Sequence, residues 1–117
     1  MDTIARIDAF FAGRAAQWAL FDALARAVLG RFPSAHLRVM KTCIAFDDPK
    51  PFIYVSFPPK KSMGGLMLSI SLRERRQHPR FCMVVPVSPS RFTAHIHLPE
   101  EAQINDELLA LIAYSRR

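Results

Sequence analysis

The sequence predicts an α+β fold with two N-terminal helices, an antiparallel β-sheet of about five strands and a C-terminal helix. Apolar residues recur at helical spacing near both ends of the chain. Between Leu37 and Leu98 they instead alternate with polar residues in short segments separated by proline and glycine turns. Strands grouped between terminal helices indicate an α+β arrangement and not a parallel sheet. We expect residues 1–117 to form one domain.

The N-terminal segment contains the two predicted helices. Asp2 or Thr3 can cap the first helix, and Gly13 is well placed to end it. The second helix runs from about residue 15 to residue 31, because Pro33 prevents its continuation. Its apolar stripe should pack on the sheet and comprises Trp18, Phe21, Ala25, Val28, Leu29 and Phe32.

The first predicted strand, residues 36–46, contains a change of phase. Apolar residues alternate within 37–39 and again within 44–46, but the two sets are out of phase by one residue. A β-bulge or a break near residues 40–42 would restore the phase. Since bulges often re-aim side chains near binding sites, Lys41 is a candidate ligand-binding residue.

Four more strands are predicted at residues 52–57, 66–73, 81–87 and 91–98. The strand at residues 66–73 shows the clearest alternation, with one apolar and one polar face. The strand at 81–87 is apolar on both faces, which predicts a central or covered position in the sheet. The last helix should begin near Asn105, a good capping residue.

Alternation also predicts which side chains share a sheet face. The helices should cover the apolar set Leu66, Leu68, Ile70, Leu72, Phe92, Ala94 and Ile96. The opposite face then collects Tyr54, Ser56, Met67, Ser69, Ser71, Arg73, Thr93, His95 and His97. Hydroxyls, imidazoles and a cation therefore converge on one surface, with Ser69 and Ser71 able to stand near His95 on adjacent strands.

The chain carries a net charge of +6, and its basic residues are partly clustered. The clusters are Lys60–Lys61, Arg73 with Arg75 and Arg76, Arg80, and Arg116–Arg117. Such clusters are typical either of solvated loop ends or of a surface for phosphates and acidic partners. The basic loop at residues 60–65 lacks the motif of a phosphate-binding P-loop.

Other motifs are missing from the sequence. Cys43 and Cys82 lie in apolar segments outside any CxxC pair, which predicts two buried core residues without a disulfide. There is no signal-peptide pattern and no apolar run of about 20 residues, so we expect a cytoplasmic protein without membrane contact. No cofactor motif is recognised.

His95 and His97 project to one side of their strand and could converge on a metal. A zinc site would need a third ligand from His36, His78 or Glu74, which the sequence does not place. A GxSxG nucleophile elbow is missing, and no carboxylate is evidently placed to orient a catalytic histidine. We therefore predict neither catalytic residues nor metal ligands.

Several segments resemble the DUF5655 family of small bacterial domains of unknown function. They are Phe11–Arg14 with Trp18–Phe21, Val39–Phe46, Pro79–Phe81, Arg91–His95, Asp106–Leu108 and Ala113–Tyr114. The resemblance implies a cytoplasmic α+β domain, found alone or attached to other domains, with no established activity. Lys41, Arg80, Phe92 and His95 match recurring positions of the family. Cys43 stands where relatives tend to have an aromatic residue, and Ala94 precedes His95 where relatives often pair two histidines.

These observations predict a small binding or accessory domain that holds an anionic ligand on the polar sheet face and the basic loops. The candidate ligand-binding residues are Lys41, Tyr54, Arg73, Arg80, His95 and His97. The partner would be an anionic small molecule or a nucleic acid. One alternative is a hydrolase or metal-assisted enzyme centred on His95 and His97. Another is a protein-interaction module that forms a homodimer through an edge strand.

Overall fold

The computed structural model describes residues 2–116 and contains, in this range, three α-helices, six strands and two 3-10 turns. Arg117, part of the last basic cluster, lies outside the described residues. The helices are α1 (Thr3–Phe10), α2 (Ala15–Arg31) and α3 (Asp106–Arg116), and the 3-10 turns are η1 (Lys61–Met63) and η2 (Glu101–Gln103). The strands are β1 (His36–Val39), β2 (Ile44–Asp47), β3 (Pro51–Ser56), β4 (Leu66–Leu72), β5 (Met83–Ser88) and β6 (Arg91–Leu98).

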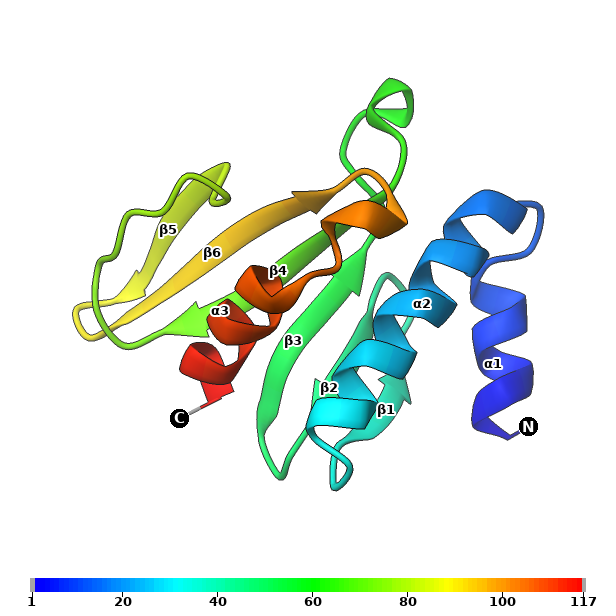
Figure 1. Cartoon of the computed structure of the whole chain (residues 1–117), viewed down its shortest axis with the longest axis horizontal. Coiled ribbons are helices and arrows are strands. Elements are labelled where there is room, and N and C mark those ends of the chain that lie inside the picture. Colours follow the sequence, from blue (N-terminus) through cyan, green and yellow to red (C-terminus); the bar gives the residue numbers. More distant parts are fainter. Residues whose placement is uncertain (1, 117) are drawn as a thin grey trace.

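The strands form one antiparallel sheet in the order β1-β2-β3-β4-β6-β5. Helices α2 and α3 lie across one face of this sheet, α1 lies beside α2, and the loop that contains η1 projects beyond the sheet (Figure 1). The α+β class and the placement of the helices are confirmed. We call the sheet face opposite α2 and α3 the open face.

The sheet has six strands because the first predicted strand is a hairpin. β1 and β2 are joined by a tight turn in which the Met40 amide donates to the Cys43 carbonyl over 2.8 Å. Val39 then pairs directly with Ile44. Cross-strand partners share a sheet face, so the chain reversal explains the change of phase. Of the two alternatives predicted for residues 40–42, the structure therefore has the break and not the β-bulge.

The core lies between the sheet and the helices. α2 buries Leu20, Phe21, Leu24, Ala25 and Val28, and α3 buries Leu108, Leu111 and Ile112. Against them the strands bury alternate residues, among them Ile44, Phe46, Ile53, Val55, Leu66, Leu68, Ile70, Leu72, Ala94, Ile96 and Leu98. Burying one such large apolar side chain contributes about 1.5–3 kcal/mol. The predicted apolar sheet face is thus confirmed, with Phe92 only partly buried.

β5 is an edge strand, so its predicted central position is wrong. Met83 and Val87 are 58% and 68% exposed, respectively. Pro86 fits this position, since an edge strand tolerates a missing amide donor. The apolar side chains of β5 that lie on the open face are not covered by any other element within residues 2–116. A homodimer through an edge strand stays a prediction.

Side-chain caps fix the beginnings of α1 and α3 as the sequence predicts. Asp2 Oδ1 accepts a hydrogen bond from the Ala5 amide over 2.8 Å, and Asn105 Oδ1 accepts one from the Leu108 amide over 3.0 Å. Gly13 lies between α1 and α2 with a φ of 74°. By contrast, Arg14 precedes α2 and makes no side-chain cap hydrogen bond, so the first turn of α2 keeps unpaired amides.

Candidate functional site

The open face carries the polar set that alternation predicts. One row crosses the whole sheet through directly paired residues, Arg38, Ala45, Tyr54, Ser69, His95 and Met83. Ser71 pairs with Thr93, and Met67 pairs with His97, on either side of this row. The face is therefore a mixed surface of hydroxyl, imidazole and sulfur groups.

The two histidines of the open face have different partners. His95 Nδ1 lies 2.9 Å from Ser69 Oγ, which confirms the expected Ser–His proximity. His97 Nε2 donates to the Gly64 carbonyl over 2.9 Å. Within residues 2–116, no three His, Cys, Asp or Glu side chains gather to hold a metal, and no carboxylate is hydrogen-bonded to His95. The Ser69–His95 pair thus lacks the orienting third group of a hydrolytic triad, and the enzyme alternative stays a prediction.

The predicted cations are spread over the molecule. Lys41 lies in the β1–β2 turn, and Arg73 directly follows β4. Register places these two positions at opposite ends of the sheet, because Ile44 pairs with Val55 near one end and Leu72 pairs with Phe92 near the other. Both side chains are exposed. Their ligand-binding roles stay predictions.

Arg80 is engaged with the beginning of α3. Its guanidinium donates to Asn105 Oδ1 over 2.9 Å and to the Gln103 carbonyl over 2.8 Å. Glu107 lies 3.7 Å away, and the Arg80 side chain is 12% exposed. The geometry gives Arg80 a structural role, in which it anchors the β4–β5 connection to α3.

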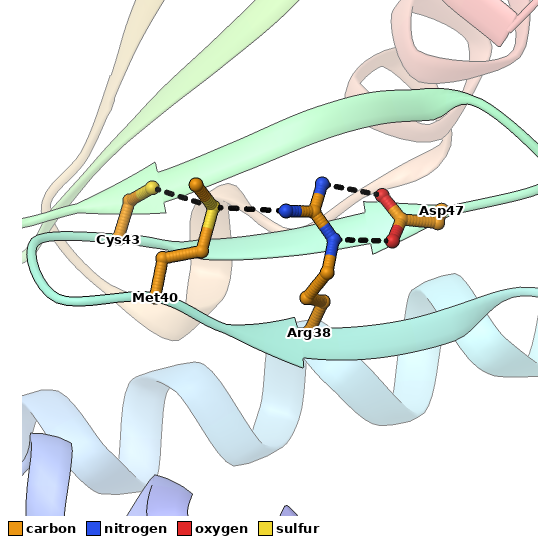
Figure 2. Close-up of polar contacts among 4 residues, drawn as sticks. All are labelled: Arg38, Met40, Cys43 and Asp47. Atoms are coloured by element: carbon orange, nitrogen blue, oxygen red, sulfur yellow. Dashed lines mark hydrogen bonds and ion pairs between the residues drawn. The ribbon is translucent and has the colours of Figure 1, made fainter.

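A further arginine on the open face is neutralised by a carboxylate. Figure 2 shows Arg38 between Asp47 and Met40, with Cys43 beyond Met40. Arg38 Nε lies 2.8 Å from Asp47 Oδ2, and another guanidinium nitrogen lies 3.3 Å from Met40 Sδ. The hydrogen bond to Asp47 and its negative charge raise the pKa of Arg38. This cation is therefore already occupied by an internal partner.

Sequence reasoning missed a pocket where α2 begins. It has a volume of about 640 Å³ and lies between the α1–α2 connection and the β3–β4 loop. Three cationic side chains line it, namely Arg14, Lys60 and Lys61. We call it the cationic pocket. The sequence signal for it is Arg14 standing where a Ser, Thr, Asp or Asn cap is usual.

Specific contacts hold the walls of the cationic pocket together. The Arg14 guanidinium carbon lies 3.9 Å from the centre of the Phe57 ring, a cation–π contact. Gln17 Nε2 donates to the Gly65 carbonyl over 2.7 Å and thereby joins α2 to the β3–β4 loop. His97 donates a hydrogen bond to the carbonyl of Gly64, which also lines the pocket. The pocket is thus built from two segments far apart in the sequence, one of which is held by His97 of β6.

A second pocket, of about 410 Å³, lies on the open face. Its lining includes Met63, Met67, Met83, Cys82, Ser69 and His95, and we call it the sulfur pocket. It shares Phe57 and Pro59 with the cationic pocket. Cys82 is exposed and Cys43 is half-buried, so the prediction of two buried core cysteines is wrong, although both are free as expected.

Comparison with known proteins gives a family but no activity. A family model described as "Domain of unknown function (DUF5655)" matches residues 7–115. No curated protein and no solved structure matches the chain. Among residues 2–116, none of the helices has the length and apolar character that a bilayer-spanning helix requires. The function therefore has to be inferred from the two pockets and the open face.

Proposed function

The chain belongs to the DUF5655 family of unknown function, and from its geometry we propose that this member binds a small phosphate-bearing anion in the cationic pocket. The main observation that supports this proposal is that Arg14, Lys60 and Lys61 line the same pocket. None of the three forms an ion pair with a carboxylate in the described part of the chain. An anion would supply the missing partner.

The contrast with other arginines supports this proposal. Arg26, Arg38, Arg80 and Arg116 each form an ion pair with an aspartate or glutamate. The cations of the pocket instead line one hollow, where repulsion between like charges raises the free energy of the site without a ligand. A bound dianion would relieve this repulsion and gain charge-assisted hydrogen bonds.

The first turn of α2 adds a second source of attraction. The amides of Ala15, Ala16 and Gln17 precede the first intrahelical hydrogen bond, which Trp18 donates to the Arg14 carbonyl over 2.9 Å. These amides and the helix dipole favour a negative charge at this end of α2. Arg14 makes no side-chain cap hydrogen bond, so its side chain does not accept from these amides.

The lining of the cationic pocket suits a small phosphate ester. Phe57 and Pro58 provide an apolar wall next to the cations, which suits the organic part of a phosphate ester. The carboxylates of Glu100 and Glu101 do not line the cationic pocket. They line a different pocket, which has Gln17 in common with it. The candidate residues Tyr54 and His95 of the open face lie outside the cationic pocket, whereas His97 supports it through Gly64.

Titration of the ¹⁵N-labelled protein with inorganic phosphate and pyrophosphate tests the proposal. We expect the amide signals of Ala15, Ala16 and Gln17 to shift, with weaker binding at higher salt. Arg14→Gln should weaken binding about tenfold or more, since a hydrogen bond to a charged group contributes about 1.5–3 kcal/mol. Lys60→Gln combined with Lys61→Gln should act in the same direction.

Arg31→Gln is the matched control, because it removes an exposed charge from the other end of the same helix. It should leave phosphate affinity nearly unchanged. Equal losses in Arg14→Gln and Arg31→Gln, or unshifted amides in residues 15–17, would refute a specific pocket. Tighter binding of a single-stranded oligonucleotide, with shifts at Tyr54 and Arg73, would instead support the nucleic-acid partner predicted from the sequence.

A further inference from the structure

We propose that the sulfur pocket binds a soft monovalent metal ion, Cu(I), through Cys82 Sγ, Met67 Sδ and the imidazole of His95. This inference does not depend on the anion site. The chain has five methionines and two cysteines. Those after Met1 gather at the open face, with Met40 and Cys43 at one side of the sheet and the others in the sulfur pocket. Thioether and thiolate groups are the ligands that Cu(I) prefers.

The spacing of two sulfur atoms fits a shared ion. Cys82 Sγ lies 4.0 Å from Met67 Sδ. Two metal–sulfur bonds of about 2.3 Å that meet at about 120° also place their sulfur atoms roughly 4.0 Å apart. An ion between them therefore requires little rearrangement. Met63 and Met83 line the same pocket and can complete the coordination shell.

His95 is oriented as metal-binding histidines usually are. Ser69 Oγ lies 2.9 Å from Nδ1, so the hydroxyl can accept a hydrogen bond from Nδ1–H and leave the lone pair of Nε2 for a metal. Nε2 makes no hydrogen bond to any residue in the range 2–116. Pairing of Ser69 with His95 across β4 and β6 fixes this arrangement in the rigid part of the sheet.

The ligand chemistry discriminates between metals. Zinc and other divalent ions favour sites with several imidazole, thiolate or carboxylate ligands, and residues 2–116 contain no cluster of three such groups. The sulfur pocket offers one thiol, one imidazole and neutral thioethers. This set matches a soft monovalent cation, for which one thiolate balances the charge.

Binding exchanges a proton for the metal without electron transfer. In the empty pocket the Cys82 thiol lies 3.2 Å from the His95 carbonyl, to which it donates. Coordination breaks this hydrogen bond, forms a Cu(I)–thiolate bond and releases one proton to solvent.

The second sulfur pair of the open face provides an internal control. Cys43 Sγ lies 3.6 Å from Met40 Sδ, but a guanidinium nitrogen of Arg38 lies 3.3 Å from the same Met40 Sδ (Figure 2). This hydrogen bond occupies the Met40 sulfur and leaves it less available to a metal than Met67. We therefore expect one Cu(I) per chain, held by the sulfur pocket.

The test is an anaerobic titration of the intact protein with Cu(I) against the chelator bicinchoninate. Ag(I), which is redox-inert, serves as the probe for NMR of protein labelled with ¹³C in the methionine methyl groups. We expect the Met67 methyl signal to shift and the Met40 signal to stay. Cys82→Ser should weaken Cu(I) binding at least a hundredfold, and Met67→Leu about tenfold.

Cys43→Ser and Met40→Leu are the matched controls and should keep the affinity of the parent protein. Cys82 is exposed, and Met67→Leu conserves volume, so both variants should fold, which their amide spectra would show. Unchanged affinity in Cys82→Ser would overturn the proposal, and so would a loss of affinity in Cys43→Ser of similar size. Binding without any shift of the Met67 methyl signal would also overturn it.

Discussion

At the scale of single residues, Gly65 carries the tightest backbone constraint in the loop that borders both pockets. Its φ is 67°, a left-handed conformation, and a Cβ atom at this position would lie 2.2 Å from the Leu98 carbonyl oxygen. Gly65 also accepts the hydrogen bond from Gln17 that joins α2 to the loop. The backbone must therefore pass close to β6 here for the cationic pocket to keep its shape.

Gly65→Ala should lower the free energy of unfolding by at least about 2 kcal/mol. The alanine side chain is strained at a positive φ, and its Cβ atom would also clash with the backbone of Leu98. Urea denaturation measures this change. Gly30→Ala is the matched control, since a Cβ atom added at Gly30 would point into open space. Gly30→Ala should raise stability by about 0.5–1 kcal/mol. Similar effects of the two variants would contradict this account of Gly65.

At the scale of secondary-structure elements, Asn105 is a junction between the β4–β5 connection and α3. Its Oδ1 accepts from the Leu108 amide over 3.0 Å and from the Arg80 guanidinium over 2.9 Å. One side-chain oxygen therefore caps the helix and also orients an arginine that is mostly shielded from solvent. Losing this oxygen affects both elements at once.

Asn105→Ala should lower the free energy of unfolding by about 1–2 kcal/mol, since it removes a helix cap and leaves an Arg80 donor with one partner fewer. Asn105→Asp keeps the acceptor and adds a charge that Arg80 and the helix dipole favour, so it should retain parent stability. Chemical denaturation of both variants measures the difference. An equal loss in both would mean that the oxygen atom is not responsible.

The elements themselves were largely predictable from sequence, and the two errors have physical causes. A change of phase in 36–46 is compatible with a bulge or with a hairpin, because both bring two apolar sets to one face. The turn at residues 40–43 lacks the Gly, Pro, Asn and Asp signals of most tight hairpins. Likewise, an apolar strand indicates burial only if a second layer covers it, and β5 has no such cover within residues 2–116.

The candidate site was only partly predictable. Strand alternation placed Ser69, Ser71 and His95 on one face, but it did not select Ser69 as the partner of His95, because alternation fixes neither strand order nor register. The cationic pocket depends instead on contacts between segments distant in the chain, such as Gln17 and Gly65, which are 48 residues apart. Lys60 and Lys61 line the same pocket as Arg14 because of the conformation of the β3–β4 loop. No local sequence pattern predicts that conformation.

At the scale of the whole molecule, Asp48 links three distant parts of the fold. It lies in the β2–β3 turn, and it accepts from Ser34 Oγ over 2.9 Å and from Arg116 Nε over 2.9 Å. It thus joins the α2–β1 connection to the last turn of α3. Hydrogen bonds from Arg116 and Ser34 stabilise the carboxylate and lower the pKa of Asp48 below its usual value.

A lowered pKa in the folded state means that Asp48 contributes stability above the unfolded-state value of about 3.9. This contribution should disappear as the pH falls through the folded pKa. We expect the stability difference between parent protein and Asp48→Asn to be largest near neutral pH and to shrink below about pH 4. Urea denaturation across this range, with ¹³C NMR titration of the Asp48 carboxyl, tests it. A difference independent of pH would contradict the assignment.

Phe57 and Pro59 form a wall that the cationic pocket and the sulfur pocket have in common. A ligand that moves Phe57 or Pro59 from one pocket changes the volume available in the other pocket. Thermodynamic linkage then makes the influence mutual, so that an anion and a metal ion would change each other's affinity by the same factor. With both proposed ligands bound, Phe57 and Pro59 would thus couple an anion site to a site for a soft metal ion.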